Sequence, residues 1–202
     1  MVEMVVIIAV VSLLVALLIP ALITAKHKAH AISCNGNLKE IGISFRIWEG
    51  DHHDQYPMAV SVANSGTMEE INGGKVASSF QVMSNAVSVP EILICPDDAR
   101  ARAATNWNNL NGSNVSYYVG LDAIETDQTD TLSGDANLIQ NGRATTSKIL
   151  GLGTNITTWT PDRHFGTANV LFCDGSVQWL KQMVGNNPSG YVYAPTNRVV
   201  IP

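Results

Sequence analysis

The side chains best suited to chemistry gather late in the chain, in the stretch TPDRHFGTANVLFCDGS. It contains a possible base, His164, a possible nucleophile, Cys173, and two carboxylates, Asp162 and Asp174. Such a set could support nucleophilic catalysis if base and nucleophile met. A structural interpretation is preferred, because Asp174-Gly175 is a typical turn between two β-rich runs and His164 before Phe-Gly fits a strand end.

Two further stretches carry possible metal ligands. In DHHD (51–54) the ligands are adjacent on one loop and seldom converge, so a solvated helix end is the better interpretation. The segment DAIETDQTD (122–130) offers the oxygen ligands that calcium prefers, although an acidic surface without an ion is preferred here too. The candidate calcium ligands are Asp122, Glu125, Asp127 and Asp130.

Three cysteines allow one disulfide with one thiol left over, if they lie in an oxidising compartment. Cys34 with Cys95 is the first choice, because Cys34 falls on the packed face of an expected helix and Cys95 ends an expected strand. Cys95 with Cys173 is the second, and three reduced thiols are the remaining alternative. No Cys-x-x-Cys spacing supports redox catalysis or zinc.

The elements that must position these residues begin with an apolar helix. Residues 4–25 carry no charge, and at 1.5 Å per residue they span about 33 Å, enough to cross a hydrocarbon core. Glu3 precedes this run, so a cleaved signal peptide, which begins with basic residues, is disfavoured. Pro20 removes one backbone hydrogen bond and predicts a kink or local unwinding. Lys26 and Lys28 follow the span and would favour a cytoplasmic head by the positive-inside rule, unless a basic leader has been removed upstream.

Beyond the span, the helix is expected to continue to Gly50 as an amphipathic arm. Spacings of four, three, four and three place one apolar stripe on a single face. The stripe is Cys34, Leu38, Ile41, Phe45 and Trp48, and the opposite face carries Asn35, Lys39, Arg46 and Glu49. The chain therefore divides into an apolar helix (1–25), its amphipathic continuation (26–50) and a globular β-rich head (51–202).

The head lacks long helical periodicity. Residues 58–90 are expected to be loop-like, and EILIC (91–95) to form a buried strand. The Asn, Thr, Asp and Gly-rich segment 99–146 is interpreted as a long surface excursion around a strand in SYYVGL (116–121).

The clearest strands come at the end of the chain. ANVLFCDGSVQWL predicts a hairpin with a two-residue type I′ turn at Asp174-Gly175. YVY (191–193) and RVVI (198–201) predict a second ribbon. The expected fold is α+β, with a long N-terminal helix laid against a small antiparallel sheet.

These features together resemble the type IV pilin and type II secretion pseudopilin superfamily. The likeness rests on the acid before the apolar run, the proline near its end, the arm CNGNLKEIGISFRIW and the stretch HFGTANVLFCDG. The last matches an H-x9-DG signature, in which nine residues separate His164 from Asp174-Gly175. The resemblance is strong over residues 1–57, good over 163–180 and weak between them.

The resemblance implies a leader removed by prepilin peptidase and a methylated new N-terminus at Met1. It implies storage in the bacterial inner membrane with a periplasmic head, then extraction by an assembly platform into an extracellular filament. Glu3 falls where the family has its assembly acid, and Pro20 where its core helices bend. Family members usually begin with Phe and have two more residues before that acid, so either two residues precede Met1 or processing differs.

The chemistry of Glu3 fits this role. A carboxylate within hydrocarbon costs a few kcal/mol without a partner. In a filament, the α-amino group of an adjacent subunit can supply the cation, and the pair then favours one axial stagger over others. A single-pass anchor with Glu3 at the headgroup level is the alternative.

The expected function is therefore structural and not enzymatic. A major subunit of an extracellular type IV pilus-like filament is preferred, a type II secretion pseudopilin is second, and a bitopic membrane enzyme using the His164 region is third. A net charge of -5 argues against a nucleic-acid partner, and calcium is the one cofactor considered. Sequons that could carry sugar are Asn111, Asn114 and Asn155.

Overall fold

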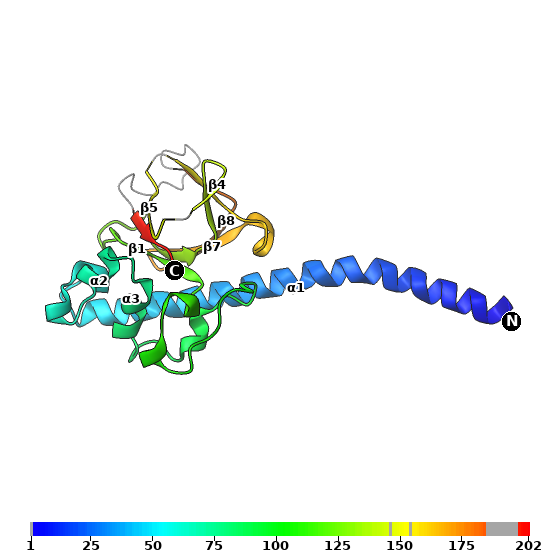
Figure 1. The fold of residues 1–202 in the computed structure, drawn as a ribbon, viewed down its shortest axis with the longest axis horizontal. Helices are drawn as coiled ribbons and strands as arrows, with labels where there is room; N and C mark the ends of the chain where they lie inside the picture. Colours follow the sequence, from blue (N-terminus) through cyan, green and yellow to red (C-terminus); the bar gives the residue numbers. More distant parts are fainter. Residues whose placement is uncertain (1, 146, 154, 185–197) are drawn as a thin grey trace.

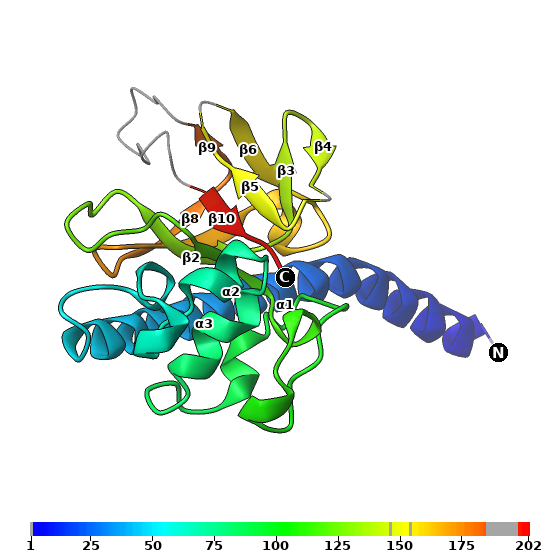
Figure 2. The same ribbon diagram turned by 60° about the vertical axis from the view of Figure 1, so that its left-hand side comes forward.

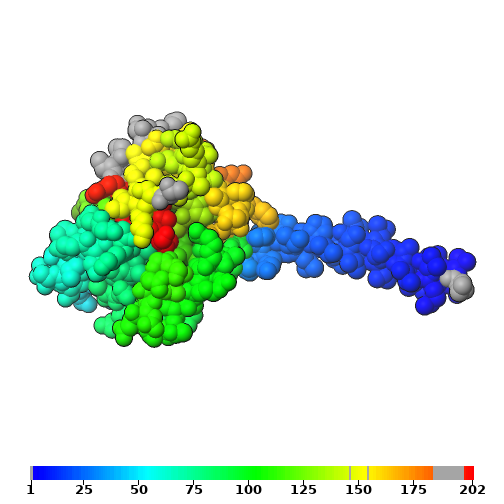
Figure 3. All heavy atoms as spheres, in the orientation of Figure 1, coloured from blue at the N-terminus to red at the C-terminus, as the bar shows by residue number. Residues whose placement is uncertain are grey.

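A single long helix, α1 (Val2–Gly50), carries the whole head on its C-terminal half in the computed structural model (Figure 1). The structure describes residues 2–145, 147–153, 155–184 and 198–202. The N-terminal half of α1 projects from the head as a bare rod (Figure 3), and its most apolar 18-residue window has a mean hydropathy of 3.2 with none of it buried. The rod is long and apolar enough to cross a membrane, as expected.

The helix does not unwind at Pro20. Helical structure runs without interruption from Val2 to Gly50, and the rod curves gently (Figure 1). The hydroxyl of Thr24 donates to the Pro20 carbonyl oxygen at 3.1 Å, within the turn that follows the proline. The prediction of a partly melted segment is thus wrong for this chain by itself, because one missing hydrogen bond bends a helix whose neighbouring turns are intact.

The predicted apolar stripe of the arm is confirmed as the face that packs on the head. Four of its side chains are fully buried and Trp48 is 6% exposed. The opposite face is less solvated than expected, because Glu49 is buried beside Arg46. Gly42 brings α1 close to the sheet, since a Cβ there would lie 3.0 Å from the side chain of Leu171.

Two antiparallel sheets form the β-rich part of the head. The larger has the order β5-β10-β1-β2-β7-β8 and the smaller β4-β3-β6-β9. The first sheet comprises β1 (Tyr117–Gly120), β2 (Thr131–Asp135), β5 (Ile149–Gly151), β7 (Ala168–Phe172), β8 (Val177–Leu180) and β10 (Arg198–Val200). The second comprises β3 (Leu138–Gln140), β4 (Arg143–Ala144), β6 (Ile156–Trp159) and β9 (Met183–Val184).

Short helices complete the head. Two are α-helical, α2 (Met68–Asn72) and α3 (Val76–Val82). The 3-10 helices are η1 (Pro57–Ala59), η2 (Val62–Asn64), η3 (Pro90–Leu93), η4 (Trp107–Asn109), η5 (Gly112–Asn114) and η6 (His164–Gly166).

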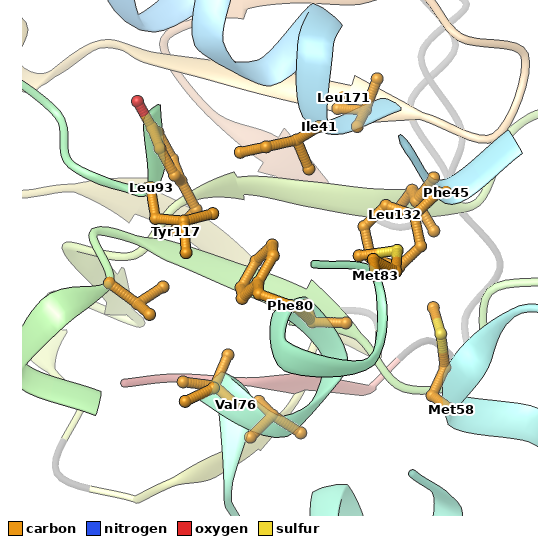
Figure 4. Close-up of a cluster of buried hydrophobic side chains, with 14 of the residues drawn as sticks. Ile41, Phe45, Met58, Val76, Phe80, Met83, Leu93, Tyr117, Leu132 and Leu171 are labelled. Atoms are coloured by element: carbon orange, nitrogen blue, oxygen red, sulfur yellow. The ribbon is translucent and has the colours of Figure 1, made fainter. Parts of the chain in front are cut away.

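The long helix and the short helices, the large sheet and the small sheet form successive layers (Figure 2), and the described residues form two hydrophobic cores between them. One lies between α1, the short helices and the first face of the large sheet, where Phe45, Phe80 and Leu171 are buried (Figure 4). The other lies between the two sheets, around Tyr118 and Trp159. The large sheet is therefore covered on both faces, and α1 supplies the cover on one of them.

Three expectations about the middle of the chain are wrong. The expected loop 58–90 contains α2 and α3, and the expected strand 91–95 is mostly η3, which begins at Pro90. The segment 99–146 is no surface excursion, because it supplies β1 and β2 at the centre of the large sheet and every residue of β2 is buried. The strand expected at 116–121 within it is confirmed as β1.

The C-terminal hairpin is confirmed, with a different turn. β7 pairs with β8, but the Phe172 amide donates to the Ser176 carbonyl at 2.9 Å, which encloses three loop residues. Gly175 has a φ of 83° while Asp174 is not left-handed, so this is a type I turn with a glycine bulge, not the expected type I′ turn. β10 pairs with β1 and β5. The expected partner 191–193 lies outside the described residues.

Because β1 is a central strand, we expect a methyl group at Gly120 to destabilise the head severely. A Cβ there would lie 2.0 Å from the Thr131 carbonyl oxygen on β2, whereas a Cβ at Gly151 of β5 would meet nothing within 4 Å. We expect Gly120→Ala to lower the free energy of unfolding by about 1–3 kcal/mol or more, and Gly151→Ala to change it little. Denaturant unfolding of both variants in detergent measures this, and equal values would contradict the central placement.

Candidate functional site: the apolar rod and the polar cluster at its junction with the head

The rod is the first candidate functional surface. Its large apolar side chains are 48–77% exposed, which leaves no contact with the head. Glu3, in the first turn, is exposed and is the one ionisable side chain among residues 2–25. Met1, the expected amino terminus, lies outside the described residues. An apolar surface of this length requires lipid or other protein chains around it.

A buried polar cluster begins where the rod enters the head. His27 and His30 of α1, three residues apart and so on one face, both direct Nδ1 at Asp97, with distances of 2.9 and 2.5 Å. Nδ1 of His164 lies 2.9 Å from the same carboxylate, and the His164 backbone amide donates to it at 3.3 Å. Burial would raise the pKa of Asp97, but the hydrogen bonds from the α1 histidines hold it below its usual range.

His164 enters this cluster on an unusual backbone. His164, Phe165 and Gly166 have φ values of 46°, 55° and 76°. All three are therefore left-handed, a conformation that is unfavourable for most residues other than glycine. The turn directs the imidazole inward, where it is fully buried, and leaves Phe165 exposed against His27 with ring centroids 4.5 Å apart. Strain of this kind persists where surrounding contacts hold it in place, and it often marks a functional position.

On its other side, the imidazole faces two thiols and a second carboxylate. Nε2 of His164 lies 3.2 Å from Sγ of Cys95 and 3.7 Å from Oδ2 of Asp135. Cys34 of α1 completes the group, whose ligand-type atoms all lie within 4.8 Å of one another. The hydrogen bond with Cys34, together with burial, raises the pKa of Cys95, and burial raises the pKa of Asp135. Burial lowers the pKa of His164, but Cys95 and the two carboxylates raise it above its usual value.

A buried ion pair lies next to the cluster, formed by the chain neighbours of Asp97 and His164. Arg163 and Asp98 are 1% and 2% exposed and form a charged hydrogen bond. Asp98 also accepts from the Ser116 hydroxyl at 2.9 Å, and Arg163 donates to the Ser116 carbonyl at 3.2 Å. Burial would raise the pKa of Asp98, but Arg163 holds it below its usual range.

The structure brings the first-choice cysteines together without joining them. Cys34 and Cys95 are adjacent in the cluster, yet all three cysteines are free thiols, so the predicted disulfide is absent from this structure. The second choice, Cys95 with Cys173, is not formed either. Cys173 lies at the β7–β8 turn, where Arg46 donates to its carbonyl oxygen at 2.6 Å.

The possible catalytic group is dispersed. His164 is buried among Cys95, Asp97 and Asp135, whereas Asp174 is exposed and caps its own turn by accepting from the Ser176 amide at 2.7 Å. Gly175 completes that turn. The two parts of the H-x9-DG motif therefore do not form one site. His164 lies in the cluster before β7, whereas Asp174-Gly175 form the turn after β7.

The candidate calcium ligands do not converge. Asp122 pairs with Arg198 at 2.6 Å and Glu125 with Arg46 at 2.9 Å. Among the described residues, the group of metal-capable side chains that does converge is the Cys34 cluster, and none of these acids belongs to it. Asp127 accepts from Thr129, and Asp130 is buried.

The sequons lie in ordered turns. The Asn111 side chain accepts from the Ser113 amide, and Asn114 completes a reciprocal cap in η5. Asn155 accepts from the Asn141 amide group at 3.0 Å. In DHHD, His52 stacks on Trp48 with centroids 3.5 Å apart, as expected for a helix end rather than a metal site.

Sequence reasoning missed most of the cluster. The pair His27 and His30, one helical turn apart, was a usable signal for a shared partner. Nothing local marks Asp97, Asp135 or Arg163, which lie far along the chain. Comparisons with protein-family models, with curated proteins and with solved structures found no match to this chain.

The buried ion pair makes a pH-dependent prediction. Asp98→Asn leaves the Arg163 charge unpaired, and we expect a loss of about 3–5 kcal/mol in the free energy of unfolding at neutral pH. Because the folded-state pKa of Asp98 is depressed, its contribution is complete above about pH 4 and is lost as the pH falls below that. The difference between wild type and variant should therefore shrink in acid.

The matched control is Asp122→Asn, which breaks the exposed pair with Arg198. We expect it to cost about 0–1 kcal/mol. Thermal and denaturant unfolding from pH 7 to pH 3 measures both variants. A cost for Asp98→Asn no larger than that of the control would show that the buried pair adds no stability.

Proposed function

We propose that this chain is a structural subunit that polymerises through the rod of α1 into an extracellular type IV pilus-like filament. The observation that carries the proposal is the rod itself, whose most apolar window is entirely unburied while the second half of the same helix lies in the head core. Each large apolar side chain gains about 1.5–3 kcal/mol on leaving water. The rod is therefore suited to a bilayer before assembly and to a bundle of identical rods afterwards.

Specific assembly needs more than apolar surface. Lipid chains are as apolar as leucine, so moving the rod from lipid to a bundle gains little hydrophobic free energy, and packing and polar contacts decide the outcome. Glu3 is the one charge available to the rod for this purpose. We assign its partner as the α-amino group of a neighbouring subunit, a pairing that would penalise wrong axial positions.

The steps before assembly follow the same proposal. The chain would be processed by a prepilin peptidase, held in the bacterial inner membrane with its head in the periplasm, and extracted by an assembly platform. Pro20 lacks one backbone hydrogen bond, so it is the position where the rod would lengthen most easily under load.

A periplasmic pseudopilus is the second candidate. The segment 99–146, expected as a surface excursion, would have suited the outer surface of a pilus, but it supplies central strands of the large sheet instead. The rod and Glu3 serve both assemblies equally. Electron microscopy of producing cells separates them, because a pilus extends beyond the outer surface and a pseudopilus does not.

The proposal predicts that Glu3→Ala abolishes assembly without unfolding the head. An α-amino group left unpaired in a dry filament core costs several kcal/mol, so we expect at least a tenfold fall in filaments sheared from cells. Negative-stain microscopy and sedimentation measure the filaments, and circular dichroism in detergent measures the head.

Glu91→Gln is the control, because Glu91 is an exposed acid of the head. It should leave filaments and folding unchanged. Abundant filaments from Glu3→Ala would contradict the proposed pairing of Glu3 with the α-amino group. Wild-type protein and variants that all stay monomeric would contradict the proposed filament.

A further inference from the structure

We propose that Cys34, Cys95, Asp135 and His164 form a tetrahedral site for a zinc(II) ion that fastens α1 to the head. The four residues come from α1, from the segment after η3, from the end of β2 and from the left-handed η6 turn. Their ligand-type atoms all lie within 4.8 Å of one another. The proposal does not depend on whether the chain polymerises.

The distances suit zinc. Zinc lies about 2.3 Å from sulfur and about 2.0–2.2 Å from nitrogen or oxygen, so the edges of its coordination tetrahedron are about 3.3–3.8 Å. Two of these edges can be compared with distances in the structure. Cys95 Sγ lies 3.2 Å from His164 Nε2, and His164 Nε2 lies 3.7 Å from Asp135 Oδ2. Small side-chain rotations would bring the set to ligand positions.

The ligand types select the metal. Two thiolates with one imidazole and one carboxylate favour zinc over calcium or magnesium, which prefer oxygen alone. All four side chains are buried, as in a structural site rather than one open to substrate. Binding requires both S–H bonds to break, and the two protons leave to solvent while the metal keeps its oxidation state.

Asp97 lies beside the His164 imidazole, on the opposite side of the ring from the other proposed ligands. His164 directs Nε2 at the ligand group, while Nδ1 lies 2.9 Å from an Asp97 oxygen without the geometry of a hydrogen bond. A carboxylate behind a histidine in this way is typical of metal-binding imidazoles and sets the ring orientation. His27 and His30 hold the Asp97 carboxylate from α1.

Asp135 gives independent evidence for a cation. Its side chain is fully buried, Oδ2 accepts from the Asn169 amide at 2.8 Å, and Oδ1 has no hydrogen-bond partner. A buried carboxylate with an unsatisfied oxygen is costly unless a positive charge compensates it. Coordination of zinc by the Asp135 carboxylate would give this group the missing partner, while the charge of the ion is balanced by the two thiolates that form when it binds.

The test uses the full-length chain in detergent, reduced and stripped of metal, then titrated with zinc chloride or cobalt(II) chloride. We expect one zinc per chain, and cobalt bands of tetrahedral coordination with a thiolate charge-transfer band. Cys34→Ala and Cys95→Ala should lose stoichiometric binding, whereas Cys173→Ala, which removes the buried cysteine outside the group, should bind as wild type does. Asp97→Asn should weaken binding about tenfold to a hundredfold with the same cobalt spectrum.

The proposed site would be contradicted if wild-type protein bound no zinc under these conditions or if the cobalt spectrum lacked a thiolate band. Zinc binding that survives Cys34→Ala would also contradict it. A Cys34–Cys95 disulfide in the native protein, found by mass spectrometry together with a lack of zinc, would do the same. If a cysteine variant fails to fold, the wild-type cobalt spectrum and zinc stoichiometry still decide the question.

Discussion

The packing of the second half of α1 into the head is the interaction on which the rest of the structure depends. Leu38, Ile41 and Phe45 are fully buried against the large sheet and the short helices. The same unbroken helix then leaves the head as the rod. Because one element is both core and rod, the head cannot fold without fixing the direction of the apolar surface it carries.

The parts of the fold that depend on local periodicity were predictable. The helix, its buried stripe and the β7–β8 hairpin follow from spacing and turn residues. So does β1, which lies within the expected strand 116–121. The burial of β2 does not follow, because its residues are largely polar and their side chains form hydrogen bonds with neighbouring strands. The Ser133 hydroxyl donates to the Tyr118 carbonyl at 2.7 Å, and the Tyr118 hydroxyl lies 2.7 Å from Thr131 Oγ1. Partners that lie 13–15 residues away decide whether such a strand is inside or outside.

The polar cluster was hidden from sequence reasoning for a related reason. Asp97 contacts His30 across 67 residues, and Cys95 contacts His164 across 69. The cysteine spacing argued against a metal, since no pair of cysteines is close in sequence, yet the fold assembles the group from four elements. The sequence did predict that Cys34 and Cys95 lie close together, but this proximity was interpreted as a disulfide.

The position of the cluster suggests why a helix already held by an apolar stripe would also need polar contacts. Apolar packing is non-directional, and a helix shifted by one turn still presents an apolar face. A slide of α1 by one turn, about 5.4 Å, would leave at most one of His27 and His30 beside Asp97 and would move Cys34 away from Cys95, so the polar contacts favour one axial position. In the proposed filament, load carried by the rod would reach the head at this junction, and the directional contacts there would resist displacement of α1 along its axis more than the apolar stripe alone.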